Sequence, residues 1–438
     1  MAIKLAKFGG SSLADAQAFG RVADIVLQDP DRRYVVASAP GKRFDADQKV
    51  TDMLYGCYDL AASGQDPSEQ FRAIEARYEE IISGLGLCFS LKQELEVIQA
   101  ETKKHPQKDY LASRGEYLNS KLLAAFLGYD FVDPAQGIFF TASGSLDEKR
   151  TYETLAEIVL SHERAVIPGF YGTGADGSIR TFTRGGSDVT GAVVARAVGA
   201  ELYENWTDVS GMLMADPRIV NDPQTIAVIS YQELRELTYM GATVLHDEAV
   251  FPARSAGIPI NIRNTNRPQD PGTMIVSKAP EDKPPHLING VAGRKGFASI
   301  TLEKDRMNAE LGFGRKVLSV LEARGISFEH LPTGIDTLSV FTQGSCLEGQ
   351  KRSIISELMS AVSPDSILLE EDIALIAVVG RGMVGEIGVA ARLLSAVANR
   401  GVRVRMIDQG SCGLNIIIGV SEEAYETAIG AIYEEFVR

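Results

Sequence analysis

Two glycine pairs, each next to a basic side chain, are the segments of this sequence best suited to hold a phosphate. Gly9 and Gly10 follow Lys7, and a second pair begins at Gly185, directly after Arg184. An apolar pattern typical of a helix follows each pair. The first N–H groups of a helix attract anions, and glycine lets the backbone approach a ligand closely. The sequence therefore predicts two anion sites that together could hold a polyphosphate and its transition state.

Both segments also have a purely structural interpretation. Ser12 followed by Asp15 resembles a capping box, and Ser187 or Asp188 would suit the N-cap of the second helix. The first segment is not a Walker A loop, because no Gly-Lys-Ser/Thr follows at the required spacing. Two such helix starts, one with a lysine and one with an arginine, favour a phosphate site over coincidence.

The composition is that of a globular protein without nucleic-acid or membrane partners. Of the 438 residues, 45% are hydrophobic and 23% charged, and the net charge is −14. This negative charge argues against nucleic acid and against an anionic membrane surface. The four cysteines lack the spacing of a zinc site, and there is no long apolar run. We therefore expect a cytoplasmic protein without a metal site built by side chains, and a length of about two to four domains.

The elements that must position these segments alternate between strands and helices. Short apolar runs predict strands near 34–39, 131–133, 165–171, 202–206 and 259–263, and a mostly helical region extends from 51 to 127. This alternation predicts an α/β domain, in which ligands bind beyond the carboxyl ends of the strands. The first domain should span 1–277, and a charged, proline-rich linker should follow at 278–286.

Several polar residues near these strand ends and helices have two interpretations each. Thr51 would either cap its helix or reach a small substrate, and Glu116 lies off the apolar stripe of its helix, as a solvated carboxylate would. Thr207, Asp208 and Arg218 belong to a segment that would form a plain loop or bind adenine, ribose or phosphate. From the residues alone, both interpretations stay open.

The last third of the chain, 287–438, repeats one pattern twice. Each copy reads strand, helix, strand, strand, helix, which predicts two ferredoxin-like units at about 298–371 and 373–438. The predicted strands include 326–330 and 402–407. The second copy lacks a closing strand, whereas an extra strand at 287–292 precedes the first copy. We expect this early strand to complete the second unit, so that one unit is inserted in the other.

Residues 380–385 fit the pattern GxGxxG, after a predicted strand and before a predicted helix at 386–400. This motif is typical of dinucleotide binding. Few residues follow it, however, and no acidic residue ends a strand about 20 positions later, as the dinucleotide fold requires. A glycine turn in a regulatory module is therefore the preferred interpretation.

Five motifs carry a family resemblance that spans essentially the whole chain. KFGGSSLAD, SRGEYLNSKLL, TRGGSD, TDVSGMLMADPR and GATVLH resemble aspartate kinases of the amino acid kinase family, and the two C-terminal units resemble ACT domains, which sense amino acids. The resemblance implies an α/β fold, a three-layer αβα sandwich with a mainly parallel sheet, followed by two ferredoxin-like ACT domains. We expect the monofunctional form, without a fused homoserine dehydrogenase.

The resemblance also implies the reaction. The γ-phosphoryl group of ATP would pass to the β-carboxylate of L-aspartate and give 4-phospho-L-aspartate, the first step toward lysine, threonine and methionine. A carboxylate is ionised at neutral pH and needs no general base. Phosphoryl transfer then requires positioning and charge neutralisation, with Mg²⁺ held mainly by the phosphates of ATP.

By resemblance, individual residues receive roles. Lys7 would neutralise the transferred phosphoryl group, and Asp188 would order the reacting groups. The residues expected to cradle the phosphates are Gly9, Gly10 and Ser11. The aspartate pocket would contain the α-carboxylate ligand Arg184, the α-ammonium ligand Glu116, and also Ser38, Thr51, Gly185 and Ser187. The nucleotide site would contain Lys7, Thr207, Asp208, Leu213, Arg218 and Thr243.

Two of the nucleotide positions depart from the family pattern. Leu213 stands where many relatives have tyrosine, and Thr243 stands where many have lysine. A stacking ring and a cation are thus absent, and the adenine contacts should differ, whereas the phosphate and aspartate ends are intact. Two alternatives remain, a kinase of another amino-acid carboxylate such as glutamate and a non-catalytic amino-acid sensor.

The ACT pair implies feedback control by an end-product amino acid, lysine first and threonine second. The candidate effector site comprises Met307, Asn308, Glu329 and Asp336, where either carboxylate would meet the effector ammonium or simply be solvated in a loop. The implied partners are L-aspartate, ATP, the regulatory amino acid and a second copy of the chain, in a homodimer or a dimer of dimers through the ACT domains.

Overall fold

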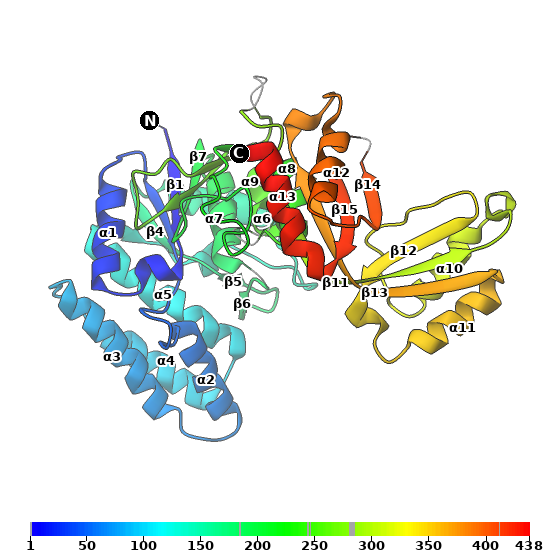
Figure 1. Ribbon diagram of the computed structural model, residues 1–438. Helices are drawn as coiled ribbons and strands as arrows, with labels where there is room; N and C mark the ends of the chain where they lie inside the picture. The colour runs from blue at the N-terminus through cyan, green and yellow to red at the C-terminus, as the bar shows by residue number, and fades with distance from the viewer. Residues whose placement is uncertain (1, 184, 243–244, 246, 280–284, 411) are drawn as a thin grey trace. The chain divides into compact units, whose positions relative to one another are not determined.

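The structure is a computed structural model that describes residues 2–183, 185–242, 245, 247–279, 285–410 and 412–438. The chain forms two compact units (Figure 1). The first comprises Met1–Met212, Thr225–Tyr231 and Val244–Ala279, and the second comprises Leu213–Gln224, Gln232–Thr243 and Pro280–Arg438. Two short segments inside the predicted first domain thus belong to the second compact unit.

An eight-stranded, mainly parallel sheet forms the centre of the first unit. The strand order is β3-β4-β2-β1-β7-β9-β10-β8. All neighbours from β3 to β9 are parallel, and β10 runs antiparallel to β9. The strands are β1 (Lys4–Phe8), β2 (Tyr34–Ala37), β3 (Asp130–Phe131), β4 (Ala165–Pro168), β7 (Leu202–Thr207), β8 (Val228–Ser230), β9 (Ile260–Asn264) and β10 (Thr273–Val276). The predicted parallel α/β sheet is confirmed.

Helices cover both faces of this sheet, which gives the predicted three-layer sandwich. Side chains alternate along β1, so that Phe8 packs with helices α1 and α5 while Lys7 points toward helix α7. The helices of this unit are α1 (Ala16–Leu27), α2 (Val50–Ala62), α3 (Ser68–Gly84), α4 (Lys92–Lys104), α5 (Lys108–Leu127), α6 (Glu148–Leu160), α7 (Gly186–Ala197) and α9 (Asp247–Ser255).

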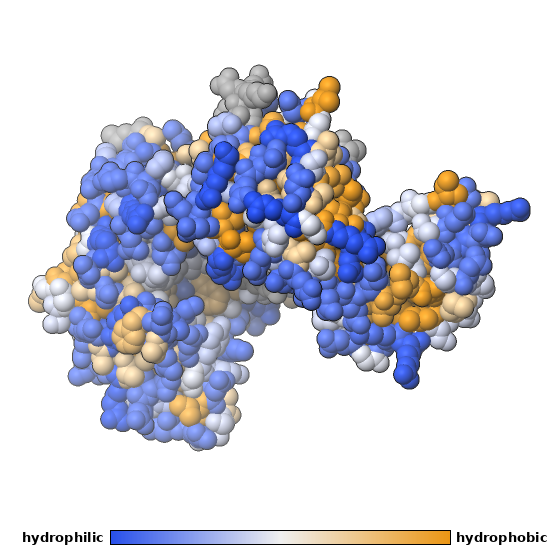
Figure 2. Space-filling model, in the orientation of Figure 1, coloured by the Kyte–Doolittle hydropathy of each residue, from blue (hydrophilic) through white to orange (hydrophobic). Residues whose placement is uncertain are grey.

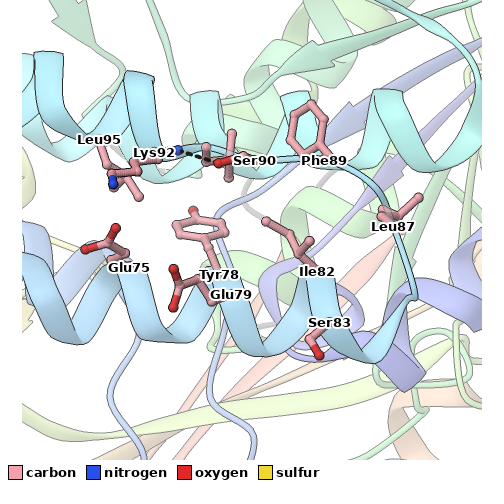
Figure 3. Close-up of a pocket in the computed structure, with 11 residues that line it drawn as sticks. Glu75, Tyr78, Glu79, Ile82, Ser83, Leu87, Phe89, Ser90, Lys92 and Leu95 are labelled. Carbon is pink, nitrogen blue, oxygen red and sulfur yellow. Dashed lines mark hydrogen bonds between the residues drawn. The ribbon is translucent and has the colours of Figure 1, made fainter.

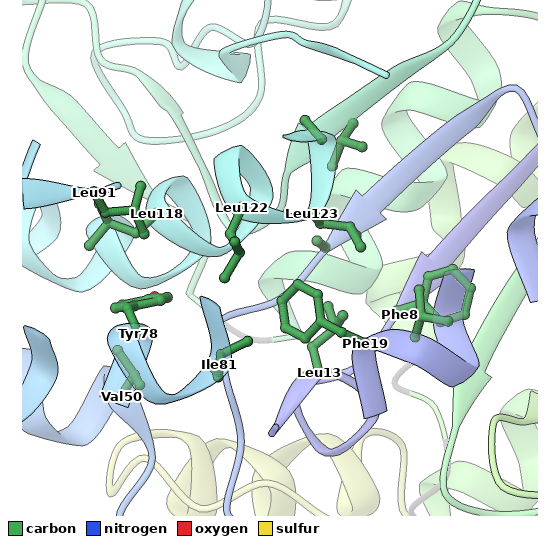
Figure 4. Packing of buried hydrophobic residues seen from close by; sticks show 14 of the residues in the cluster. Phe8, Leu13, Phe19, Val50, Tyr78, Ile81, Leu91, Leu118, Leu122 and Leu123 are labelled. Carbon is green, nitrogen blue, oxygen red and sulfur yellow. The ribbon is translucent and has the colours of Figure 1, made fainter. Parts of the chain in front are cut away.

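A hydrophobic core lies between the sheet and α5, near the carboxyl ends of the strands, where a ligand would bind. Phe8 and Leu13, from β1 and the turn after it, pack with Phe19 of α1 and with Leu118 and Leu122 of α5 (Figure 4). All five side chains are fully buried. Burial of a side chain of this size contributes about 1.5–3 kcal/mol. The packing holds α5 against the carboxyl ends of β1 and β2.

Helices α2, α3 and α4 form a helical layer next to α5 (Figure 1). A hollow of about 290 Å³ lies between α3 and α4. Glu75 and Glu79 of α3 and Lys92 and Leu95 of α4 line it, together with the ring of Tyr78 (Figure 3). Helix α3 thus presents both polar and apolar side chains to this hollow, since Ile82 and Tyr78 line it together with the two glutamates.

Two elements of the first unit differ from their sequence-based predictions. Residues 165–171 form two strands, β4 and β5 (Tyr171–Thr173), because Phe170 between them has a positive φ of 83°. Strand β5 forms the predicted hairpin with β6 (Ile179–Thr181). The first glycine pair opens a short 3-10 helix, η1 (Gly10–Leu13), while α1 begins only at Ala16.

A five-stranded sheet with the order β12-β11-β13-β15-β14 forms the second unit. The two long strands β11 (Gly290–Glu303) and β13 (Ser366–Val379) pair antiparallel along their whole length, with irregular register around Phe297. The start of β11 pairs with the end of β13, at Gly290 opposite Val379. The early strand therefore lies beside the first strand of the second repeat, which agrees with our nested interpretation.

Except for α8, which was not predicted, the remaining elements of the second unit follow the predicted order with shifted boundaries. They are α8 (Tyr231–Tyr239, from Gln232 onward), α10 (Phe313–Glu322), β12 (Thr337–Gln343), α11 (Lys351–Val362), α12 (Val389–Asn399), β14 (Met406–Gln409), β15 (Asn415–Ser421) and α13 (Tyr425–Val437). The strand predicted at 326–330 is reduced to an isolated bridge between His330 and Phe341. Pro332 follows it and lacks the N–H group that a continued ladder requires.

Packing explains the GxGxxG segment. A Cβ atom on Gly380 would lie 2.5 Å from the Cα atom of Ile288, and one on Gly382 would lie 2.7 Å from the Cα atom of Leu287. Helix α12 begins at Val389, after the motif. The glycines therefore serve the close approach of two backbone segments, in agreement with the interpretation as a turn.

On the face drawn in Figure 2, hydrophilic residues predominate and hydrophobic residues gather in a few patches. Within the described part of the chain, none of the helices combines the length and the apolar composition that a bilayer crossing requires.

Candidate active site

The carboxyl ends of the parallel strands bring the predicted phosphate-binding segments together. The turn after β1 begins at Gly9, the loop after β2 at Ser38, and the turn after β4 at Gly169. Backbone bonds join these ends: the Ser38 N–H donates to the Phe8 carbonyl (3.1 Å) and the Gly169 N–H to the Ala37 carbonyl (3.0 Å). Ligands bind at this edge in open α/β sheets.

Lys7 forms the centre of a buried polar cluster at this edge. Its ammonium lies 2.6 Å from the Asp188 carboxylate and donates to the Asn205 side-chain oxygen over 3.5 Å. The Asn205 amide in turn donates to Asp188 (3.0 Å). Lys7 and Asn205 are both nearly fully buried. The structure thus joins the two glycine-rich segments through one lysine, at a position where a phosphate would meet a cation.

Asn205 is a member of this cluster that our sequence analysis missed. It lies on β7 directly opposite Lys7 on β1. The pairing of these two strands, nearly 200 residues apart, is not visible in the sequence. Its polar side chain in a short buried strand, which also contains Glu204 and Thr207, was only a weak signal.

Asp188 is not an N-cap, and neither is Ser187. The N-cap position of α7 is Gly185, which has a left-handed φ of 55° and leaves the Asp188 side chain free to reach Lys7. Ser187 instead packs against the end of β4, since a Cβ atom on Gly169 would lie 2.5 Å from its hydroxyl. The hydroxyl of Tyr203 donates to the Asp188 carbonyl (3.2 Å) and so fixes the start of α7.

The first glycine pair has a structural role in addition to the predicted phosphate role. A Cβ atom on Gly10 would lie 2.9 Å from the Ala39 carbonyl oxygen, so glycine is needed for the β1 and β2 loops to touch. A Cβ atom on Gly9 would have room, 3.8 Å from the Lys7 ammonium. The amides of Gly10 and Ser11 are the first of the η1 turn, where no intrahelical acceptor precedes them.

The predicted capping box at this segment is wrong. Asp15 is the N-cap of α1, and its carboxylate accepts from the Ala18 amide (2.8 Å). Ser12 is buried and shares a hydrogen bond with the Thr265 hydroxyl (2.7 Å). Ser12, the second residue after the glycine pair, therefore fastens the turn to the segment after β9.

Glu116 is buried, so its interpretation as a solvated helix carboxylate is wrong. Burial raises its pKa to about 8, against the opposing effects of the Ala39 amide and the Arg114 charge. Helix α5 can approach Ala39 this closely because residue 115 is glycine. A Cβ atom at residue 115 would lie only 2.8 Å from the Ala39 side chain. One carboxylate oxygen, Oε2, has no partner among the described residues. A buried acceptor of this kind suits a bound ammonium group.

Other polar atoms lie on the same stretch of α5. The Asn119 amide donates to the Ser38 carbonyl (2.6 Å) and so ties α5 to the loop after β2. The side-chain oxygens of Asn119 and Ser120 are buried without a partner in the described part of the chain.

Thr51 is the second residue of α2 rather than its cap, which is Lys49.

The predicted nucleotide residues are divided between the two compact units. Thr207 ends β7, and its hydroxyl donates to Asp208 (3.2 Å) at the same sheet edge as Lys7. Arg218 pairs with Asp216 (2.5 Å) in the segment Leu213–Gln224, which belongs to the second compact unit together with the half-buried Leu213. The remaining site predictions, Arg184 and Thr243, lie outside the described residues.

Three of the four predicted effector residues lie together in the second unit. The Asn308 N–H donates to the Ile335 carbonyl (3.1 Å), and the Asp336 carboxylate accepts from the Arg306 N–H (2.9 Å). The Met307 side chain is buried in the core of its module and offers only its backbone to a ligand. Glu329 lies apart from these three residues. Its N–H donates to the Phe341 carbonyl of β12. Phe341 is four residues from the end of β12 that follows Asp336, which corresponds to about 13 Å along the strand.

Comparisons with known proteins agree with this geometry. Residues 2–264 match the model of the Amino acid kinase family, and 376–436 match an ACT domain. The chain belongs to the amino acid kinase family. The resemblance to aspartate kinase and the assignment as a kinase enzyme are confirmed.

Three relatives match this amino acid kinase along nearly its whole length. Aspartokinase 3 of Bacillus subtilis is 37% identical over 99% of the chain and 98% of its own length. The crystal structure of Clostridium acetobutylicum aspartate kinase is 48% identical, covers 100% of both chains and has a TM-score of 0.91. The structure of Escherichia coli aspartokinase III in complex with aspartate and ADP is 26% identical, covers 99% of both chains and has a TM-score of 0.74. The structure of the same enzyme with lysine and aspartate is also 26% identical, covers 100% of both chains and has a TM-score of 0.73.

The described residues contain no cluster of three or more His, Cys, Asp or Glu side chains that could hold a metal ion. The acceptors near Lys7 are the single carboxylate of Asp188 and the Asn205 amide. This donor set would suit a Mg²⁺ ion that arrives with a nucleotide and keeps its phosphate ligands.

Proposed function

We propose that this chain is an aspartate kinase, which transfers the γ-phosphoryl group of ATP to the β-carboxylate of L-aspartate. The observation that carries the proposal is the buried Glu116 carboxylate with an unpartnered oxygen, on a helix tied to the loops beside Lys7 and Asp188. Such a carboxylate is suited to an α-ammonium group. The complex of E. coli aspartokinase III with aspartate and ADP supports the same substrate pair.

In the proposed mechanism, the residues of the site position the two substrates and neutralise the charge on the transferred group. Glu116 binds the α-ammonium group and Arg184 the α-carboxylate, so that the β-carboxylate of aspartate points toward Lys7. The ionised β-carboxylate attacks the γ-phosphorus without a general base. Lys7 and the first amides of η1 and α7 stabilise the charge on the transferred group, and Asp188 and Asn205 orient Lys7. Mg²⁺ bound to the ATP phosphates would supply further charge neutralisation.

Release of ADP, measured by a coupled assay with a panel of amino acids, tests the proposed function. We expect ATP-dependent turnover with L-aspartate that exceeds turnover with L-glutamate by at least about 100-fold, because one methylene changes the position of the reacting carboxylate. A preference for glutamate would identify another amino acid kinase. Absence of turnover with every amino acid would favour a non-catalytic sensor.

We also propose feedback inhibition by lysine at Asn308 and Asp336, with threonine as the second candidate. The T-state complex of E. coli aspartokinase III with lysine supports this effector. A homodimer through the ACT units is part of the proposal. Its support is that Leu311 and Ile387, at equivalent turns of the two repeats, are 95% and 96% exposed, and large exposed apolar side chains are typical of interfaces.

A further inference from the structure

A buried arginine on α3 contacts both loops that carry the predicted phosphate and aspartate residues. Arg77 is 5% exposed and lies on the apolar side of α3, between Ile74 and Ile81. A charged residue is rarely retained in such a position unless it is paired, because removing a guanidinium from water is costly. None of the roles described above uses Arg77.

The guanidinium makes three contacts, each with a different part of the site. Its Nη2 donates to the carbonyl of Ala14, after the η1 turn, and to the carbonyl of Gly41, in the loop after β2, at 2.9 Å each. Its Nη1 donates to the Asp47 carboxylate at 2.8 Å. One planar group thus binds both loops from the side of α3, and only arginine presents donors in this fixed fork.

The two loops also contact each other directly through their backbones. Between them, the Gly41 N–H donates to the Gly10 carbonyl (2.8 Å), and a Cβ atom on Gly41 would lie 2.6 Å from the Gly10 backbone. The first loop carries the phosphate residues next to Lys7. The second begins at Ser38 and leads to Thr51. A change in the spacing of these loops would therefore separate the phosphate end of the site from the aspartate end.

Asp47 anchors the Arg77 fork within the second loop. Its carboxylate also accepts from the backbone N–H and the guanidinium of Arg43, at 2.9 Å each. The hydrogen bonds from Arg43, together with the Arg77 contact, keep the pKa of Asp47 well below its usual range, although burial acts in the opposite direction. Next to Arg77, the Tyr78 hydroxyl donates to the Gly115 carbonyl (2.9 Å), one residue before Glu116. Helix α3 thus contacts the turn after β1, the loop after β2 and α5.

We propose that Arg77 is a positioning residue, which holds the phosphate turn after β1 and the aspartate loop after β2 at the spacing that phosphoryl transfer requires. The inference rests on the proposed function, because it assigns those two loops to the two substrates. Arg77 itself touches neither substrate. Its loss should therefore lower turnover without abolishing the fold.

The test compares Arg77→Lys and Arg77→Ala with Arg72→Ala, an exposed arginine on the same helix. We expect kcat to fall about 100-fold in both Arg77 variants, since misplacement by about 1 Å can have that effect, while Arg72→Ala keeps its kcat. Added guanidinium ions should restore part of the kcat of Arg77→Ala. Asp47→Asn, which keeps the loop but weakens the fork, should show a smaller loss of kcat. A folded Arg77→Lys with kcat within about 3-fold of the wild type would overturn the proposal.

Hydrogen exchange without substrates separates this inference from the proposed function. In Arg77→Lys, amides of residues 9–15 and 38–49 should exchange faster together, and Arg72→Ala should leave both segments unchanged. If the wild type has no aspartate kinase activity but the two loops respond together, the proposed function fails and the positioning role stands. If exchange in both loops is unchanged in Arg77→Lys, the positioning role fails, whatever the activity of the wild type.

Discussion

At the scale of single residues, the site combines a lysine that contacts two acceptors with a buried carboxylate that has few hydrogen-bond donors. Lys7 contacts Asp188 and Asn205, so its ammonium is oriented before a phosphate arrives. Glu116 has one buried oxygen without a partner among the described residues, and burial keeps its pKa near 8. The first arrangement is suited to stabilise charge that develops in a reaction, and the second to receive a cation.

Replacing Lys7 by alanine should lower kcat by about 100- to 1,000-fold, because a preorganised charge aimed at the transferred group is lost. Steady-state kinetics at saturating ATP and aspartate measures this. Lys4→Ala is the matched control, since Lys4 lies on the same strand and pairs with Asp29 at the surface (2.7 Å). A Lys7→Ala enzyme with the turnover of the Lys4→Ala control would remove Lys7 from the proposed mechanism.

Glu116 should make aspartate binding dependent on pH. The raised pKa, about 8, means that the carboxylate forms only as the pH rises from about 6.5 to 8.5. Because only the carboxylate attracts an ammonium group, kcat/KM for aspartate should rise over this range, by up to about 10-fold per pH unit below the pKa. Glu116→Gln should have a low and nearly flat profile, and Glu79→Gln, an exposed position on α3, should follow the wild type.

The same residue has a consequence for stability. The folded chain keeps a proton on Glu116 that the unfolded chain releases above pH about 4.5, so the free energy of unfolding falls between that pH and about 8. Thermal unfolding of Glu116→Gln should therefore show less loss of stability between pH 5 and pH 8 than that of the wild type. An identical loss in both proteins would mean that Glu116 ionises as an ordinary surface carboxylate.

At the scale of elements, close backbone contacts that only glycine permits set the position of the two loops. Gly10 lies against the loop after β2, and Gly115 lets α5 approach that loop. The sequence patterns predicted most of the strands and helices and the glycine turns, because periodicity and turn residues are local properties. They did not predict Asn205 or Arg77, because their partners depend on which strands and helices become neighbours.

Gly10→Ala should damage the site, whereas Gly20→Ala should not. The new methyl group at residue 10 would lie 2.9 Å from the Ala39 carbonyl oxygen, which forces the loops apart and costs about 1–3 kcal/mol. At Gly20, inside α1, no described atom lies within 4 Å of the added carbon. That variant should be more stable by about 0.5–1 kcal/mol. Thermal unfolding and kcat/KM measured on both variants check the contrast; equal behaviour would contradict it.

At the scale of the whole molecule, a kinase sheet and a pair of regulatory repeats occupy one chain. The repeats share one continuous sheet through the long strands β11 and β13. The sequence showed the repetition, and the missing closing strand suggested the nesting, because a ferredoxin-like unit with an unpaired position is incomplete. It did not show that 213–224 and 232–243 pack with the regulatory unit, since a local pattern carries no information on long-range contacts.

If lysine binds as proposed, Asp336→Asn should raise the lysine concentration for half-inhibition by about 10-fold or more, since a charged hydrogen bond contributes about 1.5–3 kcal/mol. Asparagine keeps the acceptor for the Arg306 amide, so turnover without lysine should be unchanged. Glu329→Gln, near the other end of β12, is the comparison. Weaker inhibition in Glu329→Gln alone would place the effector ammonium there instead.

The most direct test of the central claim is the identity of the product. We predict that the enzyme, incubated with ATP, Mg²⁺, L-aspartate and hydroxylamine, forms the β-hydroxamate of aspartate in a one-to-one ratio with ADP, as measured by mass spectrometry. Release of ADP without any hydroxamate, or a hydroxamate formed on the α-carboxylate, would contradict the account.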